Sequence, residues 1–94
     1  MHGITDEMVA TQLKEAVDRL MKLTTYIELK WYGRAAIGRR EYWYGACDAF
    51  IDDKRVCMEV DGPELSIILH GMIQELEQGA PNADDNTGYV YLSF

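Results

Sequence analysis

The stretch that most constrains the fold is residues 41–60, EYWYGACDAFIDDKRVCMEV, which alternates apolar and polar residues on both sides of an Asp-Asp pair. A turn centred on that pair places Ala49 opposite Val56 and Cys47 opposite Met58. This register brings both apolar sets to one face, which is what determines register in a hairpin. The stretch therefore predicts two antiparallel strands joined by a tight turn.

Residues 41–51 also fit a helix, because Trp43, Cys47 and Phe50 recur at helical spacing. The run of three aromatic residues and the glycine after it favour the strand. In the hairpin register Cys57 lies on the opposite face from Cys47. No disulfide between these two cysteines is therefore expected.

The rest of the chain predicts two helices and two more strands. An acidic first turn and an apolar stripe predict a helix from about Asp6 to about Leu23. Strict alternation predicts strands at 26–32 (YIELKWY) and 89–94 (YVYLSF). Between them, Pro63 at the first helical position and Gly79 as a stop bound a second helix. The order is α-β-β-β-α-β.

This order predicts a single α+β domain over residues 1–94. We expect a two-layer sandwich in which both helices cover one face of an antiparallel sheet. The residues predicted to face the helices are Ile27, Leu29, Trp31, Trp43, Cys47, Val56, Met58, Val60, Val90, Leu92 and Phe94.

The same alternation places seven aromatic residues on the other face of the sheet: Tyr26, Tyr32, Tyr42, Tyr44, Phe50, Tyr89 and Tyr91. Tyrosine favours strands, so each residue alone could be an ordinary half-exposed strand residue. Together they form a large aromatic surface of the kind that meets another protein. This face is predicted to bind either a partner protein or a second copy of the chain.

The charge is divided unevenly along the chain. Residues 1–55 hold all nine Lys and Arg and nine of the sixteen acids, so the net charge of −7 lies entirely in residues 56–94. The seven acids of that segment are Glu59, Asp61, Glu64, Glu75, Glu77, Asp84 and Asp85. They favour a partner with a basic surface and oppose direct binding of nucleic acid, although Arg34, Arg39 and Arg40 could form a small basic patch.

No motif for catalysis, metal binding or a cofactor is present. His70 lies within the second predicted helix, where a structural role is more common than a catalytic one, and a ligand pocket beside it is the alternative. No apolar run reaches the length of about 20 residues that spans a membrane. The N-terminus lacks the pattern of a signal peptide, so a cytoplasmic protein is expected.

In general character the chain resembles the small phage-encoded inhibitors of bacterial defence, such as anti-CRISPR proteins. The resemblance covers its size, its charge of −7 and the run from Val56 onward that carries acids and no Lys or Arg. Acidic members of that group commonly occupy a basic, nucleic-acid-binding surface of their target. The resemblance implies a non-catalytic inhibitor and assigns no role to a particular residue.

Overall fold

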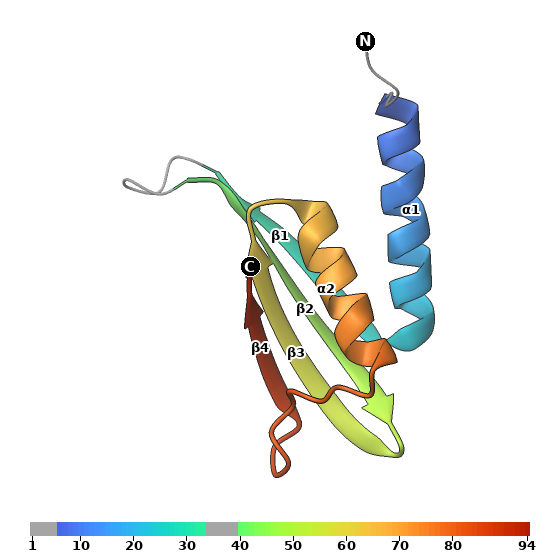
Figure 1. Ribbon diagram of the computed structural model, residues 1–94, viewed down its shortest axis with the longest axis vertical. Coiled ribbons are helices and arrows are strands. Elements are labelled where there is room, and N and C mark those ends of the chain that lie inside the picture. Colours follow the sequence, from blue (N-terminus) through green and yellow to red (C-terminus); the bar gives the residue numbers. More distant parts are fainter. Residues whose placement is uncertain (1–5, 34–39) are drawn as a thin grey trace.

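The computed structural model describes residues 6–33 and 40–94. The predicted α-β-β-β-α-β order is confirmed (Figure 1). The elements are α1 (Asp6–Leu23), β1 (Tyr26–Tyr32), β2 (Tyr42–Ile51), β3 (Lys54–Gly62), α2 (Leu65–Glu77) and β4 (Tyr89–Ser93). Residues 41–51 thus form a strand from Tyr42 onward and no helix.

The hairpin between β2 and β3 has the predicted register. Cys47 pairs with Met58 and Ala49 pairs with Val56. Both residues of the connecting turn, Asp52 and Asp53, have positive φ angles of 51° and 67°. Positive φ at both central positions gives the turn a twist that matches the twist of the flanking strands.

The sheet is mixed, and the prediction of an antiparallel sheet was wrong for one pair of strands. The strand order is β1-β2-β3-β4, and β4 runs parallel to β3. A helix between two neighbouring strands carries the chain back to the end at which it started, so the second strand runs in the same direction as the first. Here α2 is that crossover.

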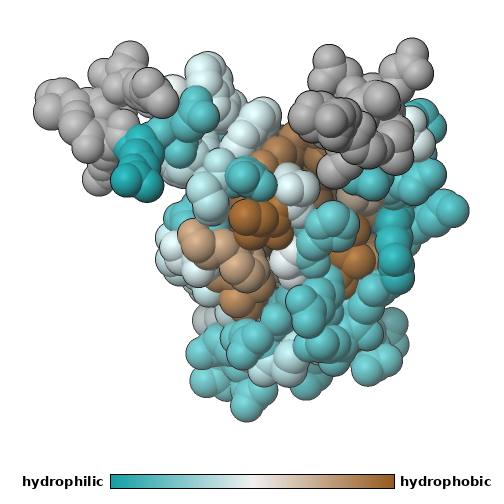
Figure 2. Space-filling model, turned by 45° about the horizontal axis from the view of Figure 1, so that its top comes forward, coloured by the Kyte–Doolittle hydropathy of each residue, from teal (hydrophilic) through white to brown (hydrophobic). Residues whose placement is uncertain are grey.

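The two helices do not share the sheet equally. Helix α2 lies over β2 and β3, whereas α1 packs mainly against α2 (Figure 1). Apolar residues reach the surface near the centre of the view in Figure 2. Trp31 of β1, predicted to be buried, is 56% exposed because α1 does not extend over it. Both helices lie on one face of the sheet, as predicted, and α1 adds Ala16 and Leu20 to the shared core, but its packing leaves Trp31 uncovered.

The buried core lies between α2 and the centre of the sheet. Its residues are Ala16, Leu20, Cys47, Ala49, Val56, Met58, Val60, Ile68, Leu69, Met72, Ile73, Leu76, Ala80 and Val90. Phe94, also predicted to be inward, is 55% exposed, although its ring lies close to Gly71 of α2. Leu20 supplies the deepest contact of α1 with this core.

The start of α2 differs from the prediction by two residues. The helix begins at Leu65, so Pro63 precedes it and Glu64 is the N-cap residue. Glu64 makes no side-chain hydrogen bond to the first turn. Asp61 lies in β3, because the strand extends to Gly62.

Candidate functional site

The candidate site is the face of the sheet opposite α2, here called the tyrosine face. All seven aromatic residues predicted to point outward do so, because each falls on the predicted pleat of its strand. Three rows of side chains cross this face from β1 to β4. They are Tyr26, Asp48, Cys57 and Tyr89; then Glu28, Ala46, Glu59 and Tyr91; then Lys30, Tyr44, Asp61 and Ser93.

Glu59 lies at the centre of the tyrosine face and accepts hydrogen bonds from two tyrosines. The hydroxyl of Tyr44 donates to its Oε1 over 2.8 Å, and the hydroxyl of Tyr89 donates to its Oε2 over 2.6 Å. These bonds stabilise the charged carboxylate, so the bond from Tyr89, followed by that from Tyr44, lowers the pKa of Glu59. Glu59 is therefore a rigidly oriented anion.

Asp61, two residues further along β3, is held in the same way. The Tyr91 hydroxyl donates to its Oδ2, and the Ser93 hydroxyl donates to its Oδ1 over 2.7 Å. The bond to Asp61 raises the pKa of Tyr91, because losing the phenol proton would place two anions side by side. Strand β3 thus supplies two carboxylates, and β2 and β4 supply the hydroxyls that orient them.

The other acids of this face are neutralised by neighbouring cations. Asp48 forms an ion pair of 3.0 Å with Arg55, and Glu28 forms one of 3.2 Å with Lys30. None of the ion pairs found among residues 6–33 and 40–94 involves Glu59. The same holds for Asp61, so these two carboxylates carry the uncompensated charge of the face.

The ends of the tyrosine face are aromatic. Tyr32 and Tyr42 stack with their ring centroids 4.8 Å apart and their planes 8° from parallel. Phe50 lies at the opposite end, next to Arg55, and is exposed. The Lys30 ammonium group lies 6.0 Å from the centroid of the Tyr44 ring, within the range of a cation–π interaction.

The remaining acids of the C-terminal segment do not join this surface. Glu64 precedes α2, and Asp85 is exposed in the loop before β4. Glu77 pairs with Arg19 of α1. Asp84 accepts backbone hydrogen bonds from Asn86 and Thr87 (2.8 and 2.9 Å), which shape its own loop.

Glu75, predicted to contact a partner, is instead buried, with 5% of its surface exposed. It accepts hydrogen bonds of 2.8 Å from the backbone N–H and the side-chain Nδ2 of Asn82. Its carboxylate therefore fixes the segment after α2 and is not available to a partner. Of the seven predicted acids, only Glu59 and Asp61 lie among the tyrosines.

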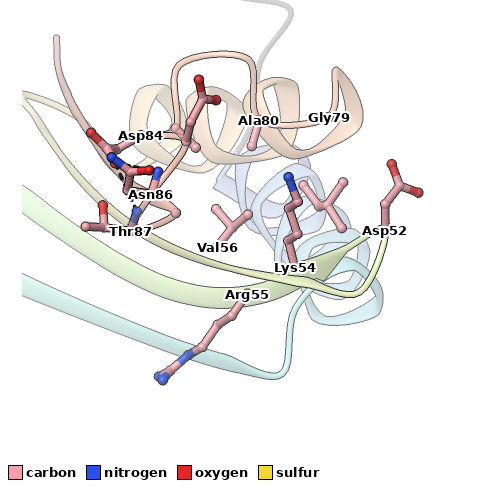
Figure 3. A pocket seen from close by; sticks show the side chains of 13 residues that line it. Asp52, Lys54, Arg55, Val56, Gly79, Ala80, Asp84, Asn86 and Thr87 are labelled. Carbon is pink, nitrogen blue, oxygen red and sulfur yellow. Dashed lines mark hydrogen bonds between the residues drawn. The ribbon is translucent and has the colours of Figure 1, made fainter.

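A second candidate is an open cavity of about 620 Å³ between the β2–β3 turn, the end of α2 and the loop before β4. In Figure 3 Lys54 points toward it, whereas Arg55 points away to the opposite face of the sheet. Its lining contains no His, Cys or Ser. His70 is exposed on α2 and lines neither this cavity nor a smaller one near Phe94.

Neither cysteine is an activated thiol. Burial raises the pKa of Cys47 to about 12. Burial, followed by a hydrogen bond with Asp48, also raises the pKa of Cys57 on the tyrosine face. Both are free cysteines, as predicted, and both are protonated at neutral pH.

The sequence-based prediction of the site left out several residues of the tyrosine face, among them the polar residues Glu28, Asp48 and Ser93. The same alternation that located the tyrosines also places these three outward. Their pairing with Lys30, Arg55 and Asp61 depends on distances between strands, for which the sequence carries no signal. Arg34 and Arg39 of the suggested basic patch lie outside the described residues.

Comparisons with protein-family models, with curated proteins and with solved structures find no match to this chain. Among the described residues, no group of three or more His, Cys, Asp or Glu is placed to hold a metal ion. No helix in the described ranges has the length and apolar character needed to cross a membrane.

Proposed function

We propose that this protein is a non-catalytic binding module that docks its tyrosine face on a basic surface of a partner protein. The observation that supports this proposal is the pair Glu59 and Asp61, each held by two hydroxyl groups and each without a cation in the described structure. Their charge is free to meet a cation from outside.

The arrangement suits arginine better than a diffuse positive charge. Each carboxylate has more lone pairs than its two hydroxyl bonds use, so it can still accept N–H bonds from a guanidinium group. The planar guanidinium also stacks on aromatic rings, and the Lys30 contact with Tyr44 is an example of a cation already held there. Tyrosine and arginine are both enriched where interfaces gain most of their energy.

A basic protein surface of this kind commonly serves to bind nucleic acid. We therefore propose an inhibitor that occupies such a surface in the cytoplasm, as acidic anti-CRISPR proteins do. The acids repel phosphate, so the protein would compete with nucleic acid and would not bind it.

A homodimer through the tyrosine face is the alternative that the exposed rings favour. Four of the six tyrosines and Phe50 are more than a third exposed in a single chain. A two-fold contact places the same patch on both sides. It would bring Glu59 and Asp61 of one copy toward those of the other, and like charges in contact are unfavourable. The basic partner is therefore the stronger proposal.

The test compares two double variants that remove the same charge. Glu59→Gln with Asp61→Asn removes both charges of the face and keeps side chains of the same shape, whose amide C=O accepts from one hydroxyl and whose NH2 donates to the other. Glu64→Gln with Asp85→Asn removes two charges elsewhere. Binding of an arginine-rich peptide, measured by titration calorimetry at two salt concentrations, should weaken about tenfold or more in the first variant and less than about threefold in the second.

Equal losses in the two double variants would show that only net charge matters and would refute a specific site. Light scattering provides the check on the alternative. A monomer at all concentrations excludes the homodimer, whereas a dimer that Tyr44→Asp and Tyr91→Asp disrupt would replace the proposal with it.

A further inference from the structure

Strand β4 forms one edge of the sheet and pairs on one side only. The Cys57 N–H donates to the Gly88 carbonyl over 2.9 Å, and the Phe94 N–H donates to the Asp61 carbonyl over 2.9 Å. The N–H and C=O of one residue point to the same edge of a strand, and those of the next residue point to the other. The even-numbered residues of β4 therefore bond to β3, and the odd-numbered residues point away from it.

The outer edge of β4 is open over its second half. The Tyr89 carbonyl accepts a 2.9 Å hydrogen bond from the N–H of Asp84, which covers the first half. No backbone hydrogen bond in the described parts of the chain reaches the outward N–H or C=O of Tyr91 or Ser93. Four aligned backbone groups thus remain for another strand.

Nothing in the sequence of β4 protects this edge. Edge strands usually carry Lys, Pro, a bulge or an inward charge that prevents pairing. β4 reads YVYLS, with no charge and no proline. The opposite edge, β1, carries Glu28 and Lys30 at its centre. The open, uncharged edge is therefore specific to β4.

The two sides of this edge differ in chemistry. On the tyrosine face, Tyr91 and Ser93 flank the edge and lead to Asp61. On the other side lie Leu92, which is half-buried, and Phe94, which is exposed. A strand laid against β4 would meet an acidic surface on one face and an apolar surface on the other.

We propose that β4 accepts an extended segment of the partner as a fifth strand, with arginine or lysine at alternate positions and apolar residues between them. This inference rests on the proposed function, since the same carboxylates select the basic side chains. The added strand would lie about 9–10 Å from β3, two strand spacings, which the length of an arginine side chain can bridge. Main-chain bonds supply affinity in this mode and alternate side chains supply specificity.

The charge pattern favours this occupant over a second copy of the chain. Two copies of β4 paired edge to edge would offer each other no cation, because the strand has none. They would also bring together two C-terminal segments that each carry seven acids and no Lys or Arg. A basic partner strand instead neutralises Glu59 and Asp61.

The test uses an eight-residue peptide of alternating arginine and valine, blocked at both ends, with the full chain. Ser93→Pro removes the outward N–H of Ser93 and leaves in place the backbone bonds to β3, which the even-numbered residues make, as proline is tolerated on an open edge. Ser93→Ala is the matched control, because it also loses the hydroxyl bond to Asp61 but keeps the N–H. Calorimetry should show affinity at least about tenfold lower for Ser93→Pro than for Ser93→Ala.

Hydrogen exchange provides a second measurement that needs no variant. In the wild-type protein, the amides of Tyr91 and Ser93 should exchange about tenfold or more slowly once the peptide is bound. An isomer with four arginines followed by four valines should give no such protection. If Ser93→Pro does not fold, the exchange rates of these two amides in the wild-type protein decide whether the peptide pairs with β4.

Three outcomes would overturn the inference. The first is equal peptide affinity of the two Ser93 variants together with unchanged amide exchange. The second is binding of the block isomer as tight as that of the alternating peptide. The third is protection of the Tyr91 and Ser93 amides by raising the protein concentration alone, which would indicate a second copy. If the peptide binds through Glu59 and Asp61 while the Ser93 variants behave alike, the added strand is wrong and the proposed docking face stands.

Discussion

At the scale of single residues, position in the fold decides what an acid does. Glu75 and Glu77 stand two residues apart on α2, yet one is buried and the other lies at the surface. Glu75 satisfies two donors of Asn82, whereas Glu77 pairs with Arg19. Removing a buried carboxylate leaves its hydrogen-bond donors without an acceptor. This destabilises the protein far more than the loss of a surface ion pair.

We therefore predict that Glu75→Ala lowers the free energy of unfolding by about 2–3 kcal/mol, because the Asn82 donors lose a charged acceptor. Glu77→Ala, the matched control, should cost less than about 1 kcal/mol, because its ion pair is exposed. Urea denaturation followed by circular dichroism measures both. Equal costs would mean that the Asn82 contacts contribute little.

At the scale of elements, the parallel pairing of β4 with β3 depends on how closely the backbone of Gly88 approaches the backbone of β3. This residue has a φ angle of 69°, and a Cβ placed on it would lie 2.1 Å from the carbonyl oxygen of Arg55. That oxygen belongs to the backbone of β3, so it cannot move aside as a flexible side chain could. Glycine is required here for both conformation and space.

Gly88→Ala should cost about 3 kcal/mol or more, because it adds a backbone clash to the strain of a positive φ angle. Gly79 has a φ angle of 84° but nothing within 4 Å of its Cβ position. Gly79→Ala should therefore cost about 1 kcal/mol, the strain alone. Thermal unfolding would measure both; a similar decrease in Tm for the two variants would contradict the close-approach argument.

At the scale of the whole molecule, acid pH is expected to be the sensitive side, because folding stabilises the charged form of several carboxyl groups. The pKa values of Glu59, Asp48 and Asp84 are each lowered by hydrogen bonds made in the folded state, from Tyr89, Arg55 and the backbone N–H of Thr87 respectively. A carboxyl with a lowered folded pKa contributes stability above its unfolded pKa and loses it as the pH falls through the folded value. Stability should thus decrease below about pH 4.5.

The contribution of Glu59 to this pH dependence of stability can be isolated by removing the two hydroxyls that donate to it. We predict that Tyr44→Phe with Tyr89→Phe destabilises the protein most at neutral pH, and that the difference from wild type shrinks below about pH 4.5, where Glu59 becomes protonated in both. Tyr32→Phe with Tyr42→Phe, which keeps the stacked rings, should give a difference independent of pH. Denaturation curves at several pH values test this; parallel curves for all three proteins would be the contrary result.

Local patterns in the sequence were enough to predict the elements and the two faces of the sheet. Alternation needs only the pleat, so it placed Tyr26, Tyr44 and Tyr91 outward, and the position of the Asp-Asp turn determined the pairing of Cys47 with Met58. Free cysteines followed from the same register. These features depend on neighbours along the chain or across one tight turn.

Only the tertiary structure decided how the elements are arranged and which charges remain uncompensated. The parallel pairing of β4, the exposure of Trp31 and the burial of Glu75 depend on where α1 and α2 pack, and no local period encodes that packing. The acids of the C-terminal segment look alike in the sequence. Burial and partners from distant strands separate Glu59 and Asp61 from the rest, because interaction energies depend on distance in space.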